Sequence, residues 1–514
     1  MMVPDTFNAA SYFVDRHTAE GRGGDVAIEC GTERVTYGQL AERVNRVGNA
    51  LRDQLQVRIE ERVVILLSDG PEFIYAFFGA LKIGAVPIPV NTLWKAADYE
   101  YVLNDSRARV LIVGEALRPQ IDVIARARPR YLRHVVVVDR DFDALVAAAS
   151  PDLEAEPTSK DDAAFWLYSS GSTGFPKGCV HLHHDMVTCA EAYAKGVLGI
   201  TASDRCFSVA KLFFAYGLGN SMYFPFSVGG TTILWPGPST AGNVYSIIEA
   251  RRPTMFFSVP TNFGMLLAHR REGADFDLSS LRIVVSAGEA LPAALFERFK
   301  QRFGVEILDG IGSTEVLHIF ISNRPGAVRP GSSGRLVPGY DARLVDEHNE
   351  AVPTGQIGNL LIRGDSTCAA YWNRHEKSKD AIEGHWIRTG DKYVRDEDGY
   401  FWYAGRSDDM LKVGGVWVSP VEVENVLVEY HGIMECGVVG RPDHDGLIKP
   451  AAYVVLEPDV EGTPELASAL QEWVSTRLAP YKRPRWIEFV PELPKTATGK
   501  IQRFKLRERG AVVV

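Results

Sequence analysis

Cysteine is scarce in this sequence of 514 residues, which has six cysteines lying far apart. No two of them form a CxxC pair or follow the ligand spacing of a zinc site. This pattern argues against a disulfide framework and predicts reduced, mostly buried thiols in a cytoplasmic protein. The first residues also lack a basic start followed by an apolar core, so we expect no signal peptide.

An excess of positive charge and a long hydrophobic run are missing too. The formal net charge is −9, so no overall positive field attracts nucleic acid or an anionic membrane surface. The most apolar stretch, residues 71–90, is interrupted by Glu72 and Lys82. It also contains Pro87 and Pro89, whereas a membrane-spanning helix needs roughly 20 apolar residues. We therefore expect no nucleic-acid or membrane partner. Residues 71–90 are expected to form a core helix followed by a core strand.

The residues that are present predict an α/β fold with two domains. A share of 46% hydrophobic and 24% charged residues is typical of a globular protein. Helical patterns alternate with short apolar runs, which favours sheets covered by helices. The predicted buried strands are residues 63–67, 109–114, 134–139, 231–235, 254–259 and 281–288. These elements predict a large N-terminal domain with several α/β subdomains, residues 1–405.

The composition changes near Gly405, where polar turn residues and paired glycines precede a valine-rich helix. The remaining residues contain a helical segment, 465–480, and three apolar runs, enough for a small core of their own. We expect a hinge near Asp408 and a mobile α+β lid, residues 406–514.

Residues 168–178, YSSGSTGFPKG, are the strongest local signal. Glycines let backbone N–H groups converge on an anion, the hydroxyls add donors and Lys177 adds positive charge, so the segment predicts a phosphate-binding loop. A helical segment is expected to follow. The GxxxxGK[ST] spacing of a Walker loop is absent. A flexible loop without a ligand is the alternative. The candidate residues are Ser169, Ser170, Gly171, Ser172, Thr173, Gly174 and Lys177.

This loop resembles the signature [YF]-[ST]-S-G-[ST]-T-G-x-P-K-G of the adenylate-forming superfamily of acyl-CoA synthetases, carrier-protein adenylation domains and beetle luciferases. Further matches follow in the family order: SAGEAL at 286–291, GIGSTE at 310–315, TGD at 389–391, GRSDDMLK at 405–412 and PKTATGK at 494–500. The resemblance covers nearly the whole chain and implies the adenylate-forming fold, with a large N-terminal domain and a lid.

The resemblance also implies a nucleotide site. Thr314 is expected to hold a phosphate and Glu315 to ligate Mg²⁺, a hard cation that prefers oxygen; the alternative is a helix N-cap formed by Ser313 or Thr314. Asp391 has two oxygens suited to the ribose hydroxyls, and Arg406 would assist at the ribose or phosphate. The adenine would contact Gly288, Glu289, Ala290, Asp309, Gly310 and Ile311. For Asp309, a turn-forming role is the alternative.

Three more residues take their roles from the resemblance. Lys500 would enter the active site in one lid orientation and bridge the substrate carboxylate and the α-phosphate. Lys412 would face the site after the lid rotates, and Asp408 would be the pivot of that rotation. Acetylation of Lys500 by a lysine acetyltransferase would remove the required charge. A homodimer is a further expectation.

The implied reaction activates a carboxylate, which is a poor acyl donor. The acid attacks the α-phosphate of ATP to give an acyl-AMP and pyrophosphate, with Mg²⁺ and lysines stabilising the charge, and the thiol of coenzyme A then displaces AMP.

The acyl group would lie between residues 211–219 and 310–319. FFAYGLGN together with GSTEVLHIF resembles benzoate-CoA and 4-hydroxybenzoate-CoA ligases, so an aromatic carboxylate is the expected substrate. The expected pocket residues are Phe214, Ala215, Tyr216, Gly217, Gly312, His318 and Ile319. For His318, the alternative is a hydrogen-bonded histidine of the core. For the pocket, the alternative is a tunnel that binds a long fatty acyl chain. Transfer of the acyl group to a carrier protein is the alternative function, and a non-catalytic nucleotide-binding protein is a third hypothesis. The nearby HLHH, residues 181–184, lacks a third ligand at metal spacing.

Overall fold

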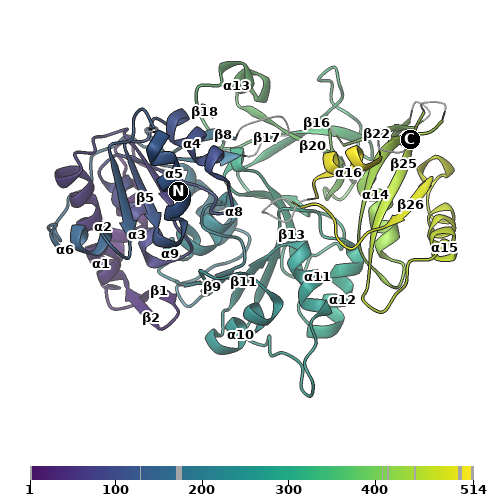
Figure 1. Ribbon diagram of the computed structural model, residues 1–514, viewed down its shortest axis with the longest axis horizontal. Coiled ribbons are helices and arrows are strands. Elements are labelled where there is room, and N and C mark those ends of the chain that lie inside the picture. Colours follow the sequence, from purple (N-terminus) through teal and green to yellow (C-terminus); the bar gives the residue numbers. More distant parts are fainter. Residues whose placement is uncertain are drawn as a thin grey trace.

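A large part built on α/β sheets is followed by a small C-terminal part in the computed structural model (Figure 1). The structure describes residues 3–127, 129–169, 176–407, 409–413, 416–444, 447–495 and 501–510. All six cysteines are free thiols, and five of them are buried, as the sequence predicts. Within the described ranges, no helix has both the length and the apolar character to cross a membrane.

A four-stranded parallel sheet forms the first α/β layer, in the order β4-β3-β5-β6. Its strands are β3 (Arg62–Leu66), β4 (Val86–Pro89), β5 (Val110–Gly114) and β6 (His134–Val138). The associated helices are α2 (Tyr37–Asn49), α3 (Pro71–Lys82), α4 (Ala96–Asp105), α5 (Arg118–Ala127) and α6 (Phe142–Ala147). The Thr36 hydroxyl caps α2 by accepting from the Gln39 backbone N–H. The predicted helix and strand within residues 71–90 are confirmed as α3 and β4.

A nine-stranded sheet forms the second layer, in the order β15-β14-β13-β12-β11-β9-β10-β1-β2. Its strands are β1 (Val26–Cys30), β2 (Glu33–Thr36), β9 (Arg205–Ser208), β10 (Thr231–Leu234), β11 (Met255–Ser258), β12 (Ile283–Ser286), β13 (Ile307–Gly312), β14 (Ile319–Ser322) and β15 (Arg335–Leu336). The strands from β13 to β1 run parallel, with antiparallel strands at both ends. One face packs on α10 (Ala241–Arg251), α11 (Pro260–Ala268) and α12 (Ala293–Phe303). The carboxyl ends of β12 and β13 therefore meet at one edge, where such sheets bind ligands.

The phosphate-loop candidate joins two strands of a small antiparallel sheet, which corrects one expectation. β7 (Ala163–Ser169) leads into the loop and β8 (Lys177–Leu182) leaves it, with β18 (Ala370–Tyr371) beside β8. The expected helix after the loop is wrong, because residues 177–182 pair with both neighbouring strands. The next helix, α7 (Asp185–Cys189), begins later.

The large part also contains short helices. They are η1 (Ser11–Asp15), α1 (Arg16–Ala19), η2 (Ala50–Gln54), η3 (Glu115–Leu117), η4 (Ala190–Lys195), α8 (Ala215–Leu218), η5 (Gly219–Tyr223), α9 (Phe224–Phe226) and η6 (Thr314–Val316). Most of them contribute residues to the main hydrophobic core, whereas α1 and η3 do not.

A five-stranded antiparallel sheet completes the large part. It contains β16 (Asp341–Val345), β17 (Ile357–Arg363), β19 (Ile382–Glu383), β20 (Trp386–Arg395) and β21 (Phe401–Arg406), and α13 (His375–Ala381) lies beside it.

The residues after β21 have two hydrophobic clusters of their own. Their elements are β22 (Leu411–Val413), β23 (Val416–Val418), α14 (Pro420–Val428), β24 (Ile433–Pro442), β25 (Ile448–Leu456), α15 (Pro464–Ser475), η7 (Pro480–Lys482), β26 (Trp486–Phe489) and α16 (Arg503–Gly510). The predicted helix at 465–480 corresponds to α15 and η7. A small α+β part at the C-terminus is thus confirmed, while the boundary at 405/406 and the hinge remain predictions.

Candidate active site

Strands β7 and β8 place two predicted phosphate-binding residues opposite each other. Ser169 ends β7 and pairs in register with Lys177, the first residue of β8. The other predicted loop residues lie outside the described ranges: Ser170, Gly171, Ser172, Thr173 and Gly174. The hairpin therefore fixes the two ends of the candidate phosphate loop.

The carboxylate of Glu315 comes to this hairpin from a distant part of the chain. Its Oε1 accepts a hydrogen bond from Ser169 Oγ at 3.3 Å. The Tyr371 hydroxyl donates to the same oxygen at 2.9 Å. The Lys177 Nζ lies 4.2 Å from the centre of the Tyr371 ring. The structure thus brings together Ser169, Lys177 and Glu315, and adds Tyr371, which the sequence analysis missed. The sequence around Tyr371 has no motif that indicates a functional residue, only an aromatic residue after two alanines.

Thr314 and Glu315 lie on η6, directly after β13. The Ser313 hydroxyl accepts from the Val316 N–H and caps this short helix. The capping alternative is therefore confirmed for Ser313, and it leaves the side chains of Thr314 and Glu315 for other roles.

The oxygen-rich donor set fits Mg²⁺. Mg²⁺ is commonly held by one or two carboxylates together with substrate phosphates and water, rather than by an all-protein cage. Glu315 supplies such a carboxylate next to the two ends of the phosphate-loop candidate. Among the described residues, no cluster of three His, Cys, Asp or Glu side chains competes with it as a metal site.

The predicted adenine residues lie at the carboxyl ends of β12 and β13. Ser286 pairs with Asp309, and Gly288 just beyond β12 has a φ of +93°, which favours glycine. Asp309 lies inside β13, so the turn alternative for it is wrong. Its side chain is buried, which raises the pKa of the carboxyl well above its usual range. Its Oδ1 has no hydrogen-bond partner among the described residues, which fits a polar group of a ligand.

Neighbouring residues complete this edge of the sheet. The Thr261 hydroxyl donates to Glu289 Oε2 at 3.3 Å. Gly310 pairs with Ser322 on β14, and Ile311 pairs with Ile321. Ala290 follows Glu289 in the connection between β12 and α12.

The predicted ribose residues form an ion pair across β20 and β21. Arg406 Nη1 donates to Asp391 Oδ1 at 3.0 Å and to the Thr389 carbonyl at 2.9 Å. Gly390 has a φ of +75°, and a Cβ there would lie 2.7 Å from the Arg406 guanidinium. Only glycine therefore suits this turn without moving the arginine.

The predicted lid residues follow the phosphate-loop, adenine and ribose residues in the sequence. Lys412 lies on β22 with an exposed side chain. Asp408 and Lys500 fall outside the described ranges, so their pivot and bridging roles remain predictions.

The predicted acyl-binding residues come from α8 and from the segment after η6. Phe214 precedes α8, and Ala215, Tyr216 and Gly217 lie on it. The Tyr216 hydroxyl donates to the carbonyls of Ser258 and Val285, both at 3.3 Å, which fixes the ring at the ends of β11 and β12.

His318 connects the two halves of this group. Its Nε2 lies 3.3 Å from the Tyr216 carbonyl and 3.2 Å from Asn220 Oδ1. Burial lowers the pKa of His318 to about 3, so its imidazole is neutral and Nε2 is the donor. The ring is almost fully buried, with ring centroids of Phe224 at 4.4 Å and Tyr216 at 5.5 Å. This geometry matches the alternative of a hydrogen-bonded core histidine, which here joins the two candidate pocket segments.

Gly312 is the last residue of β13 and Ile319 is the first residue of β14. They pair in register, and a Cβ on Gly312 would lie 2.5 Å from the His318 carbonyl oxygen. Glycine is thus required where the backbone of β13 approaches His318.

Two family models match this chain. The model described as AMP-binding enzyme matches residues 15–372, and the one described as AMP-binding enzyme C-terminal domain matches residues 422–500. The chain belongs to the AMP-binding enzyme family. The adenylate-forming superfamily resemblance and the fold class predicted from the sequence are confirmed.

Full-length relatives are similar to this member of the family. It is 48% identical to a benzoate–CoA ligase of Thauera aromatica, over 98% of this chain and 96% of that protein. It is 42% identical to a 4-hydroxybenzoate–CoA/benzoate–CoA ligase of Rhodopseudomonas palustris, over 98% of this chain and 94% of that protein.

Two solved structures share the whole fold. An anthranilate CoA ligase in complex with anthranoyl-AMP superimposes with a TM-score of 0.95 and 46% identity, covering 99% of this chain and 98% of that one. A benzoate CoA ligase from Burkholderia xenovorans LB400 superimposes with a TM-score of 0.91 and 48% identity, covering 98% of this chain and 100% of that one.

Proposed function

We propose that this protein is an ATP-dependent aryl-CoA ligase. It converts benzoate, or a close analogue such as 4-hydroxybenzoate, into the CoA thioester through an acyl-adenylate, and it releases AMP and pyrophosphate. One observation carries this proposal. Ser169 donates a hydrogen bond to the carboxylate of Glu315, 146 residues away in the sequence, and Ser169 pairs with Lys177 across the hairpin. The names of the full-length relatives support an aromatic acid as substrate.

The first half-reaction joins the acid to AMP. A carboxylate oxygen of the acid attacks the α-phosphorus of ATP, and the bond from that phosphorus to the pyrophosphate oxygen breaks. Lys177 and Lys500 offset the negative charge that develops on the phosphate oxygens. Glu315 would hold Mg²⁺, which supplies additional positive charge to the phosphates when bound.

Other residues orient the nucleotide. The two oxygens of Asp391 are suited to the ribose hydroxyls, with Arg406 orienting one of them. Asp309 presents a buried oxygen to the adenine amino group.

The second half-reaction transfers the acyl group to coenzyme A. The thiolate sulfur attacks the carbonyl carbon of the acyl-AMP, and the mixed anhydride breaks to release AMP. Rotation of a lid formed by residues 406–514 about Asp408 exchanges Lys500 for Lys412, so one site serves both steps. Tyr216 and Phe214 provide flat rings, and Ile319 an apolar side chain, for packing against an aromatic ring.

Two further expectations from the sequence belong to this proposal, one on regulation and one on the oligomeric state. Acetylation of Lys500 would remove the charge needed in the first half-reaction, and deacetylase treatment of modified protein would restore activity. Sedimentation of the purified protein would test the expected homodimer.

A substrate screen tests the proposal. AMP release would be measured with ATP, CoA and each of benzoate, hydroxybenzoates, aminobenzoates, fluorobenzoates, furoate, cyclohexanecarboxylate and hexanoate. We expect benzoate or a substituted benzoate to give the highest kcat/KM. A preference for hexanoate, or faster transfer to carrier proteins than to CoA, would contradict it. ATP–pyrophosphate exchange at background with every acid would indicate a non-catalytic nucleotide-binding protein.

A further inference from the structure

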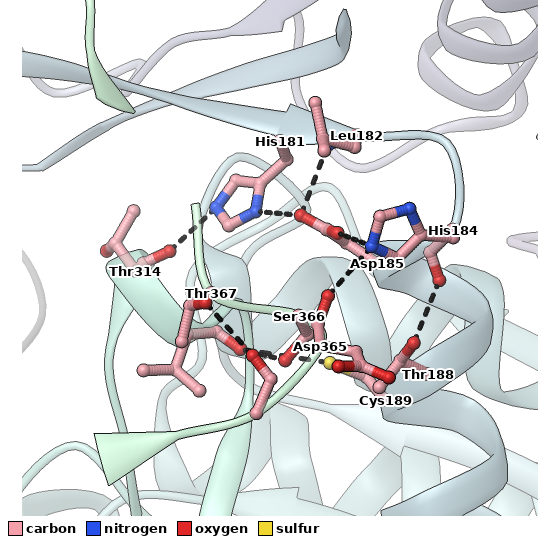
Figure 2. A network of polar contacts seen from close by, with 12 residues as sticks. His181, Leu182, His184, Asp185, Thr188, Cys189, Thr314, Asp365, Ser366 and Thr367 are labelled. Atoms are coloured by element: carbon pink, nitrogen blue, oxygen red, sulfur yellow. Dashed lines mark hydrogen bonds and ion pairs between the residues drawn. The ribbon is translucent and has the colours of Figure 1, made fainter. Parts of the chain in front are cut away.

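A buried histidine on β8 reaches the backbone of η6 (Figure 2). The His181 ring has no exposed surface, and its Nε2 lies 2.8 Å from the Thr314 carbonyl oxygen. Its Nδ1 lies 2.8 Å from Asp185 Oδ2, which also accepts from the Leu182 N–H at 3.1 Å. Both ends of the imidazole are therefore engaged inside the protein.

The partners of His181 determine its donors. A carbonyl oxygen can only accept, so Nε2 must carry a proton and donate to Thr314. On the other side of the ring, Nδ1 shares its hydrogen bond with Asp185 Oδ2. His184 Nε2 donates to the Asp365 carbonyl and lies 3.2 Å from Asp185 Oδ1 on the other side. Asp185 is thus held at Oδ2 by the His181 imidazole and a backbone N–H, while its Oδ1 has no hydrogen-bond partner among the described residues.

The backbone is strained at the other end of η6 from the carbonyl that His181 contacts. Leu317, the residue after η6, has a φ of +70° and a ψ of −43°, a conformation that is costly for a residue with a side chain. Such a conformation persists only when the surroundings hold it. All three carbonyls of η6 accept hydrogen bonds from outside it. The donors are His181 Nε2 to Thr314, the Cys368 N–H to Glu315 at 2.7 Å, and Ser366 Oγ at 2.8 Å with Cys189 Sγ at 3.9 Å to Val316.

His181 differs in its position from the Cys368 and Ser366 donors. It lies on β8, the strand that begins with Lys177, whereas Cys368 and Ser366 lie on the segment before β18. The His181 contact therefore connects the strand of the phosphate-site lysine with the helix of Thr314 and Glu315.

We propose that His181 and Asp185 form a positioning pair that sets the spacing between Lys177 and the Thr314–Glu315 backbone for Mg²⁺–ATP. This inference deepens the proposed function and rests on the roles given there to Lys177, Thr314 and Glu315. The pair acts through the backbone and contacts no reacting atom.

Two substitutions at His181 separate its two hydrogen bonds. In His181→Gln the amide nitrogen extends to the place of Nε2 and can donate to the Thr314 carbonyl. In His181→Asn the shorter amide reaches only the place of Nδ1 and loses that donor. The control is His183→Asn, because His183 is equally buried on the neighbouring turn but accepts from the distant Ala9 N–H at 3.1 Å.

The main measurement is equilibrium binding of ATP at a series of Mg²⁺ concentrations, by calorimetry, in the absence of acid. Loss of a residue that orients a metal ligand typically costs about 10- to 100-fold in affinity. We expect His181→Asn to weaken Mg²⁺–ATP binding about tenfold, and His181→Gln and His183→Asn by less than about threefold. The KM for benzoate should stay within about twofold of wild type in all three.

Several outcomes would overturn the proposal: equal losses in the two His181 variants, an equal loss in the control, or a parallel rise in the KM for benzoate. If His181→Asn shows no cooperative unfolding transition, Asp185→Leu decides, since it keeps the imidazole but removes the carboxylate oxygen that His181 Nδ1 and the Leu182 N–H contact. Wild-type Mg²⁺–ATP affinity in that variant would refute the pair. Because binding is measured without acid, a wild-type protein inactive with every aromatic acid would refute the proposed function and leave this comparison intact.

Discussion

The Glu315 carboxylate is held by side chains on two different strands, and one of them can be tested alone. Tyr371→Phe removes the hydroxyl that donates to Oε1 but keeps the ring beside Lys177. A hydrogen bond to a charged group contributes about 1.5–3 kcal/mol. We therefore expect ATP–pyrophosphate exchange to fall about 10- to 100-fold and the required Mg²⁺ concentration to rise.

The ring contact provides the comparison for this variant. Tyr371→Leu removes the hydroxyl and the ring, so its exchange activity should fall further than that of Tyr371→Phe. A Tyr371→Phe protein with wild-type exchange and Mg²⁺ dependence would show that the hydroxyl does not position Glu315.

Asp69 gives the protein a pH-dependent stability term. Its Oδ1 accepts from the Leu212 N–H at 2.9 Å, and Lys211 Nζ lies 3.7 Å from Oδ2. Burial raises the pKa of Asp69 from 3.8 to about 6. The folded protein thus retains a proton that the unfolded chain releases, so this stability term is present below about pH 4 and is lost as pH rises through about 6.

We expect Asp69→Asn to remove this loss. The unfolding free energy of wild type relative to the variant should fall by about 3 kcal/mol between pH 3 and pH 7, because one pKa unit is about 1.4 kcal/mol. Urea unfolding at several pH values measures the difference. Asp53→Asn is the control, because the pKa of Asp53 is lowered by Arg52 instead. A constant difference across this range would contradict the assignment.

At the scale of elements, the parallel strands could be predicted and the meeting points between them could not. β3, β5 and β12 are continuous apolar runs because both faces of these strands are covered. The sequence predicts a helix where β8 lies, because KGCVHL has no clear periodicity and one of its two partner strands, β18, lies far along the chain. Tyr371 had no local signal, since its contact with Glu315 spans 56 residues. The family motifs located the site residues, but not the side chains that hold them.

The helical segment from α8 to η5 approaches the candidate acyl site closely at Gly219. A Cβ there would lie 2.4 Å from His318 Cδ2, while the backbone φ of −65° suits any residue. Gly219→Ala should therefore displace His318 without straining its own backbone. We expect the KM for benzoate to rise about tenfold or more, with ATP binding within about twofold of wild type.

A matched glycine lies on α11. Gly264→Ala would meet nothing within 4 Å and should leave the KM for benzoate unchanged. Substrate saturation curves at fixed ATP separate the two variants. Equal KM values for benzoate in Gly219→Ala and wild type would place the aromatic acid away from His318.

At the scale of the whole molecule, the two lysines assigned to different lid orientations lead to opposite predictions. Lys412 lies on β22, and Lys500 follows Lys495 beyond the described part of that region. Each would offset charge in one half-reaction, a contribution that typically amounts to about 100- to 1000-fold in rate. We expect Lys500→Ala to lose ATP–pyrophosphate exchange by this factor, while thioester formation from supplied benzoyl-AMP and CoA stays within about threefold of wild type.

Lys412→Ala should show the reverse. Exchange should remain near wild type, while thioester formation from benzoyl-AMP falls, because this lysine would face the site only after the lid has rotated. Each variant serves as the control for the other, and rapid quenching with separate detection of pyrophosphate and thioester measures both half-reactions. If each variant lost both activities to the same extent, the two lysines would act in a single orientation, and rotation about Asp408 would not be needed to explain catalysis.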